Sequence, residues 1–177
     1  MMKKSKIEVS LSKTKLFFVI IGCLIFVALG IFMLLNGEEM QTRKFSPIWI
    51  IGFGGIAVLF FGGICIAVIK KMFDKSPGLR IDENGIWDNS SGVSAGLIAW
   101  KDILKIRKIS VSGTRFLLID VQNPEAYINN AKGGIKKMTM KANTKKYGTP
   151  ISISANGLRI KFNALEELLA KALETYR

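Results

Sequence analysis

The sequence has no histidine, and it has only two cysteines and four prolines in 177 residues. The absence of histidine excludes histidine acid–base catalysis, Ser-His and Cys-His nucleophilic pairs and the usual zinc sites. Both cysteines, Cys23 and Cys65, lie within apolar runs and have no Cys-x-x-Cys spacing, so we expect no metal site and no disulfide in a reducing compartment. We therefore expect a protein that is not an enzyme and that binds no cofactor or metal ion.

Acidic residues are also scarce, and the charges are separated from the apolar residues along the chain. There are 13 Asp and Glu against 26 Lys and Arg, a formal net charge of +13, although hydrophobic residues make up 49% of the sequence. Two runs, Leu16–Leu35 and Phe45–Ile69, contain no charged residue at all. A bilayer core needs about 20 helical residues, so each run is long enough to span it. Since neither run holds an ionisable group at depth, the runs indicate an anchor and not a channel or transporter.

Two alternatives to a membrane hairpin are buried helices in a soluble core and, for the first run, a removable signal peptide. The sequence at Leu34–Glu38 offers no small-x-small cleavage pattern, which disfavours a signal peptide. We therefore expect both runs to remain in the protein as transmembrane helices.

Basic residues lie before the first run and after the second, and such residues favour the cytoplasmic side of a membrane. The pattern predicts a basic cytosolic tail at 1–15, transmembrane helices at 16–35 and 45–69, an external loop at 36–44 and a cytosolic domain at 76–177. Both termini are then cytoplasmic. The residues behind this orientation are Lys3, Lys4, Lys6, Lys13 and Lys15 before the first run, Lys70, Lys71, Lys75 and Arg80 after the second, and a loop in which Glu38 and Glu39 balance Arg43 and Lys44.

The second apolar run is rich in small residues. Small residues on one face of a helix, or at small-xxx-small spacing, let two helix backbones approach closely in a membrane. The simplest partner is the first run, and the alternatives are a second copy of this chain or the helix of another protein. The candidate packing residues are Gly52, Gly55, Gly62, Gly63 and Ala67.

From Ser76 onward the pattern changes to short strand-like segments separated by turns. One segment, Thr114–Val121, is apolar on both faces and is predicted to be a central strand. Asn156-Gly157 predicts a hairpin between the last two segments, whereas residues 125–147 are predicted to be irregular helix and loop. The predicted strands are Leu79–Asp82, Ile86–Asn89, Leu97–Lys101, Leu104–Val111, Thr114–Val121, Pro150–Ser154 and Leu158–Phe162.

The C-terminal segment has the clearest helical periodicity. An apolar stripe that includes Leu165, Leu169 and Ala172 predicts a helix lying on the sheet. Asn163 and Glu166 have the spacing of a capping box at its start. The fold class is therefore α+β: a two-helix transmembrane hairpin, then an antiparallel β-barrel or sandwich of about seven strands with a C-terminal amphipathic helix. That order of elements is the order of a pleckstrin-homology-like (PH-like) domain.

Several segments resemble small bacterial membrane proteins that join two transmembrane helices to a cytosolic PH-like domain. The resemblance lies in Gly78–Ile86, Ile98–Ile103, Asn123–Tyr127, Gly148–Ile153 and the final helix. The departure is the long lysine-rich stretch between the fifth and sixth strands, where a minimal PH-like barrel has only a turn. The resemblance implies a binding scaffold in the bacterial cytoplasmic membrane, since folds of this kind host many unrelated ligands.

Basic residues without acidic neighbours are the strongest functional signal. No Asp or Glu occurs between Glu125 and Glu166, where lysines accumulate, and a second basic cluster lies at 101–108. A basic residue near an anionic leaflet is worth about 1 kcal/mol of attraction, so we expect this surface to bind anionic lipid or an acidic partner; a merely solvated surface is the alternative. Aromatic residues are not interleaved with arginine, so nucleic-acid binding is not expected. The candidate contacts are Lys70, Lys71, Lys101, Lys105, Arg107, Lys108, Lys132, Lys136, Lys137, Lys141, Lys145 and Lys146.

Two functions of different classes fit these features. In the first, the chain is a membrane-tethered interaction module that binds a protein or peptide, for example at an open sheet edge, or anionic lipid at the inner leaflet. In the second, it is a membrane-anchored immunity protein whose lysines meet an acidic surface of a bacterial toxin. We prefer the first hypothesis because it assumes less.

Overall fold

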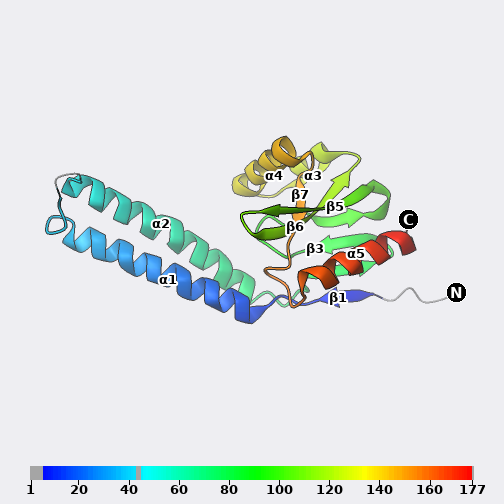
Figure 1. Ribbon diagram of the computed structural model, residues 1–177, viewed down its shortest axis with the longest axis horizontal. Coiled ribbons are helices and arrows are strands. Elements are labelled where there is room, and N and C mark those ends of the chain that lie inside the picture. The colour runs from blue at the N-terminus through cyan, green and yellow to red at the C-terminus, as the bar shows by residue number, and fades with distance from the viewer. Residues whose placement is uncertain (1–5, 43–44, 177) are drawn as a thin grey trace. The chain divides into compact units, whose positions relative to one another are not determined.

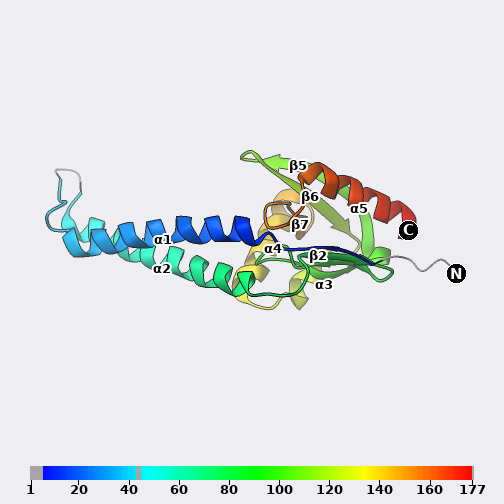
Figure 2. The same cartoon turned by 90° about the horizontal axis from the view of Figure 1, so that it is seen from below.

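The computed structural model describes residues 6–42 and 45–176 (Figures 1 and 2). Its chain forms two compact units, which are Lys13–Asp74 and a second unit of the described residues up to Ser12 together with those from Lys75 onward. Residues 1–5, 43–44 and 177, which fall in the predicted tail, external loop and cytosolic domain, lie outside the described residues. The first unit is a pair of helices, and the second, the sheet unit, contains two antiparallel sheets and several helices.

Two long helices, α1 (Lys13–Asn36) and α2 (Pro47–Met72), form the first unit and lie side by side in both views (Figures 1 and 2). Both are long and apolar enough to cross a membrane. α2 begins at Pro47, where the missing N–H of proline costs no helix hydrogen bond. Most apolar side chains of the pair face outward, and Leu35 and Leu59 are 79% and 80% exposed. This surface is unlike that of helices buried in a soluble core.

The backbones of the two helices come close together at Gly30 and Gly54, which are both buried. A Cβ atom added to Gly30 would lie 2.9 Å from the carbonyl oxygen of Gly54, and one added to Gly54 would lie 2.7 Å from the carbonyl oxygen of Gly30. Both distances are shorter than a carbon–oxygen contact allows. The backbones can therefore touch only because neither residue has a side chain.

The small residues that the sequence suggested for this contact lie elsewhere on α2. Gly52, Gly62 and Gly63 have no atom within 4 Å of the position that a Cβ would take, and Ala67 is exposed. Gly55 comes only to ordinary contact distance of Leu34, at 3.9 Å. Gly52, Gly62 and Gly63 therefore make no close contact with α1 in the structure, and packing of these residues in a membrane interface stays a prediction.

Replacing Gly54 by leucine is expected to force the helices apart, because its Cβ would overlap the Gly30 carbonyl. We expect a loss of about 1–3 kcal/mol in the stability of the helical pair, the usual cost of overpacking. Gly63→Leu is the matched control, because a Cβ atom added at Gly63 has no atom within 4 Å. Titration of the full chain with dodecyl sulfate, followed by helicity, measures the difference. Equal loss in both variants would contradict the assigned contact.

The first sheet has the strand order β1-β2-β3-β4, and every neighbouring pair is antiparallel. Its outer strand β1 comes from the N-terminal segment, and Val9 of β1 pairs with Leu79 of β2. The same segment also pairs on its other side, where the Ser12 N–H donates to the Gly157 carbonyl at 2.8 Å and the Arg159 N–H donates to the Ser10 carbonyl at 2.9 Å. The strands are β1 (Ile7–Val9), β2 (Leu79–Asp82), β3 (Gly85–Asp88) and β4 (Gly96–Ala99).

The described residues up to Ser12, within the segment predicted as a basic tail at 1–15, are thus part of a folded unit. These residues belong to the sheet unit, with Val9 and Leu11 buried in its core. The helical pair is consequently an insertion between two neighbouring strands, β1 and β2, that are far apart in sequence.

The second sheet has the order β5-β6-β7, with β5 (Ile103–Val111) following a 3₁₀ turn, η1 (Trp100–Asp102). As predicted, β6 (Thr114–Val121) is the central strand. β7 is Ile151–Ile153. Within the described residues the two sheets are not closed into a barrel.

Helices cover both faces of the second sheet, as Figure 1 shows. α5 (Phe162–Tyr176) packs with both sheets around the main core, where Leu165 and Leu169 are fully buried. α3 (Pro124–Asn130) and α4 (Gly134–Tyr147) lie on the other face. The core residues that are fully buried with α5 include Leu79, Ile81, Ile86, Ile98, Leu117, Ile119 and Ile153.

Three expectations for the C-terminal part are corrected. The Asn156-Gly157 hairpin does not form, because the backbone of 157–159 pairs with the N-terminal segment and not with β7. Asn163 does not cap α5, which begins one residue earlier, and its side chain accepts a hydrogen bond from Arg115 at 2.9 Å. Residues 125–147 are largely regular helix, in α3 and α4.

Candidate functional site

The basic residues of β5 are held by carboxylates of the protein itself. Arg107 donates to both carboxylate oxygens of Asp120, at 2.7 and 2.8 Å, and also to the carbonyl of Tyr147 at 2.7 Å. The hydrogen bond to Asp120 raises the pKa of Arg107. Lys105 lies 3.8 Å from the same carboxylate, and Lys108 lies 3.0 Å from Glu166 of α5. The charge of Lys105, Arg107 and Lys108 is thus largely engaged within the fold.

The β5 cluster is also divided between the two faces of its sheet. Successive side chains of a strand point to opposite faces. Arg107 accordingly contacts the carbonyl of Tyr147 at the end of α4, whereas Lys108 reaches α5 on the other face. A single basic patch on β5 is therefore not formed.

The remaining candidates outside α4 lie in three separate segments of the chain. Lys70 and Lys71 lie in the last turn of α2, where Lys71 is 3.6 Å from Asp74. Lys101 is exposed beside an open hollow of about 450 Å³ in the sheet unit, next to Trp100, whose ring stacks on Tyr176. Lys132 is exposed between α3 and α4.

α4 gathers the other predicted lysines on one short helix that has no acidic residue. The helix is bounded by two glycines in the left-handed region, Gly133 at φ 93° and Gly148 at φ 81°, and the Gly148 N–H donates to the carbonyl of Thr144 at 2.9 Å as a helix C-cap. Met140 is buried and fixes the inner side of the helix. No ion pair joins an α4 lysine to any residue in the described part of the chain. These lysines are Lys136, Lys137, Lys141, Lys145 and Lys146.

The outer side of α4 also exposes apolar residues that sequence reasoning missed. Ile135 is 78% exposed and Met138 is 66% exposed. With Ala142, which is also exposed, they follow the i, i+3, i+7 spacing of one helix face. Lys141, Lys145 and Lys146 are exposed on the same helix. The i, i+3, i+7 spacing was the signal that could have revealed this face. The lysines around it made the segment appear irregular.

α3 links this helix to η1. Its first turn is capped by the side chain of Asn123, which accepts from the Ala126 N–H at 3.2 Å. The Tyr127 hydroxyl donates to Asp102 at 3.0 Å, and burial together with that carboxylate raises the pKa of Tyr127. These contacts fix the start of the α3–α4 segment against the sheet unit.

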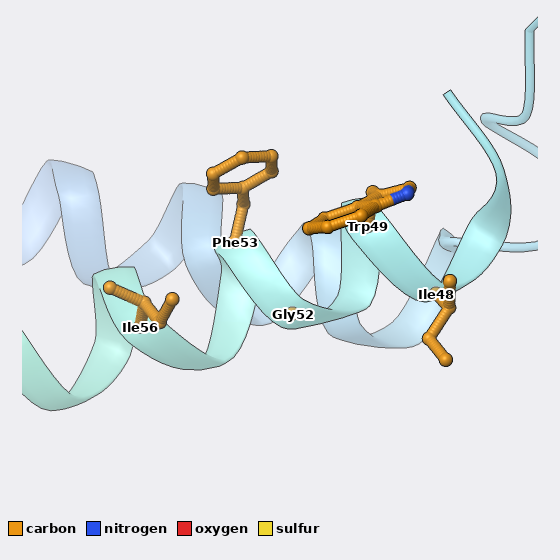
Figure 3. A pocket seen from close by; sticks show the side chains of 5 residues that line it. All are labelled: Ile48, Trp49, Gly52, Phe53 and Ile56. Carbon is orange, nitrogen blue, oxygen red and sulfur yellow. The ribbon is translucent and has the colours of Figure 1, made fainter. Parts of the chain in front are cut away.

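An apolar groove of about 300 Å³ lies on α2 (Figure 3). Gly52 forms its floor, because it has no side chain, and the rings of Trp49 and Phe53 lie on the same side of the helix in Figure 3. No charged residue lines it, so the groove suits a hydrocarbon chain or an apolar helix surface and not a polar ligand. Its remaining walls are Ile48 and Ile56.

Within the part of the chain that the structure describes, no cluster of three or more His, Cys, Asp or Glu could hold a metal ion. No protein-family model, curated protein or solved structure matches this chain. The outer side of α4 combines exposed apolar side chains with lysines that form no ion pair in the described part of the chain.

Proposed function

We propose that the protein is a non-enzymatic binding module that is anchored in the bacterial cytoplasmic membrane by α1 and α2, and that its sheet unit binds anionic lipid of the inner leaflet through α4. The observation that carries this proposal is the set of α4 lysines without an acidic partner. The apolar outer surface of α1 and α2 supports the anchor.

The pairing of β1 with β2 supports a hairpin in the membrane. The two strands belong to one sheet, which supports a topology in which the segment before α1 and the segment after α2 lie on the same side of the membrane. The helices between them must then cross an even number of times. Removal of α1 as a signal peptide would also remove β1 from the protein.

We propose that the sheet unit is a variant PH-like domain. Two antiparallel sheets, of four and three strands, and a C-terminal helix support that assignment. The variation is an N-terminal strand separated from the rest by the membrane helices, and the α3–α4 segment inserted between β6 and β7. The insertion is also the segment that carries the candidate binding surface.

Charge makes the inner leaflet a suitable ligand for α4. A basic residue near an anionic membrane surface is worth about 1 kcal/mol, and this attraction falls off within a Debye length. The three exposed lysines, Lys141, Lys145 and Lys146, together provide about 3 kcal/mol. Such a weak free energy is sufficient for a domain that is already tethered to the membrane, because the tether raises its effective concentration at the surface.

The proposal is tested with the full chain in nanodiscs. Cys23 and Cys65 are replaced by alanine, a donor dye is attached to α4 through Ala142→Cys, and an acceptor dye is carried on lipid headgroups. We expect higher energy transfer in discs that contain phosphatidylglycerol than in discs of phosphatidylcholine alone, with a decrease as salt is raised. The double substitution Lys141→Gln, Lys145→Gln should weaken docking by about 2 kcal/mol, or about thirtyfold.

The control removes the same charge from a different helix. Lys161→Gln with Lys171→Gln changes the net charge equally, but both residues lie outside α4 and are exposed near or on α5. Docking should be nearly unchanged in this variant. Equal energy transfer in neutral and anionic discs would refute lipid binding and would favour a soluble acidic partner, as the immunity hypothesis requires.

A further inference from the structure

We infer that α4 is an interfacial helix, which inserts Ile135 and Met138 at the boundary between headgroups and acyl chains while its lysines contact lipid phosphates. This inference rests on the proposed function and adds to it the depth and the chemistry of binding. An anionic surface alone would require only the lysines. The exposed apolar residues require a ligand with an apolar layer beneath its charges.

The composition of the exposed face supports this assignment. Ile135 and Met138 are among the most exposed large apolar side chains of the sheet unit, at 78% and 66%. An α-helix turns 100° per residue, so these two side chains and Ala142 fall within one narrow sector. Lys145 lies to one side of that sector and Lys146 to the other. Apolar residues flanked by lysines are the pattern of helices that lie in the plane of a membrane interface.

The inner face of α4 shows why this pattern does not arise from packing in the fold. Met140 is 1% exposed and points to the sheet unit. Asn143 and Tyr147 line a small hollow together with Phe116 and Leu118 of β6. The inner face of α4 therefore already packs on its own domain through apolar and polar side chains. Ile135 and Met138 are not part of that contact.

Charge complementarity selects a bilayer as the occupant of the outer face. A second copy of the same face would place lysines against lysines, because α4 has no acidic residue. An anionic bilayer satisfies the lysines with phosphates and the apolar pair with hydrocarbon. The covalent link to α1 and α2 ensures that such a bilayer is always near.

The test uses the full chain in nanodiscs that hold one copy each, with the polarity-sensitive dye NBD attached through Met138→Cys in the cysteine-free background. In discs that contain phosphatidylglycerol we expect the NBD emission to shift to the blue and to rise severalfold relative to phosphatidylcholine discs. The same dye at Asn156→Cys, on an exposed turn, should not respond. Single-copy discs exclude a response that comes from self-association.

A second variant tests the apolar pair without a dye on it. Ile135→Gln with Met138→Gln should weaken docking about tenfold in the energy-transfer assay, because transfer of apolar area from water is lost. Leu97→Gln with Leu104→Gln is the control, since these residues are also exposed but lie on β4 and β5.

The outcomes separate this inference from the proposed function. A blue shift at position 138 that disappears with Lys141→Gln and Lys145→Gln supports both. Lysine-dependent energy transfer without a blue shift, and without an effect of the glutamine pair, would overturn the insertion and leave electrostatic docking. Neither energy transfer nor a blue shift in anionic discs would overturn both.

Discussion

Replacing Leu11 by aspartate is expected to unfold the sheet unit while the helical pair stays intact. Leu11 is 5% exposed, pairs with Leu158 and packs in the main core. A carboxylate at this position would be buried without a partner, which a small domain cannot tolerate. The milder change Leu11→Ala should cost about 2–5 kcal/mol, as for other large-to-small core substitutions.

Ile7 provides the matched control for this prediction. It lies in the same N-terminal segment but is 37% exposed, so Ile7→Asp should cost far less. The measurement is denaturant unfolding of the full chain in detergent, followed by the fluorescence of Trp87 and Trp100 in a Trp49→Phe background. If Leu11→Asp left the transition of the sheet unit unchanged, the N-terminal segment would be a tail after all, and the strand pairing of β1 would be wrong.

The elements that could be predicted from sequence are those with a local signal. The two apolar runs lie within α1 and α2, and the turn at Glu83-Asn84 joins β2 to β3 as expected. β6 was identified as central because both of its faces are apolar, which follows from the helices on both sides of its sheet. In each case the decisive information lies within a few neighbouring residues.

The N-terminal strand could not be predicted, because its partners are distant. Ile7–Val9 is a very short segment among lysines, and β2 and residues 157–159 are separated from it by the whole helical pair or more. The prediction of a hairpin at Asn156-Gly157 is wrong for the same reason. Its second arm takes the N-terminal segment as its partner, and a local turn signal contains no information about that competitor.

The candidate site shows the same division between local and distant information. The lysine count of 132–146 was visible in the sequence, whereas the carboxylates that engage the β5 cluster became visible only with the strand and helix packing, in particular Asp120 and Glu166. The close approach at Gly54 likewise depends on Gly30 of the other helix. Spacing within α2 alone does not distinguish that face from the one that carries Gly52 and Gly63.

The pairing of β1 with β2 predicts that the two ends of the helical pair lie on the same side of the membrane. Both ends of the described chain should be on the cytoplasmic side, and the turn between α1 and α2 should be on the outside. Lysines around the predicted spans favour the same orientation. A single cysteine at Lys6→Cys or Asn156→Cys reports the side expected to be cytoplasmic, and one at Gln41→Cys reports the side expected to be outside. Each is introduced in the background without Cys23 and Cys65.

The anchored hairpin is tested by labelling these three variants with a membrane-impermeant maleimide in bacterial cells, before and after the cytoplasmic membrane is opened. We expect Gln41→Cys to be labelled in intact cells, and Lys6→Cys and Asn156→Cys to be labelled only after opening. Labelling of Asn156→Cys in intact cells, or labelling of Lys6→Cys and Asn156→Cys from opposite sides, would contradict the anchored hairpin and the function proposed from it.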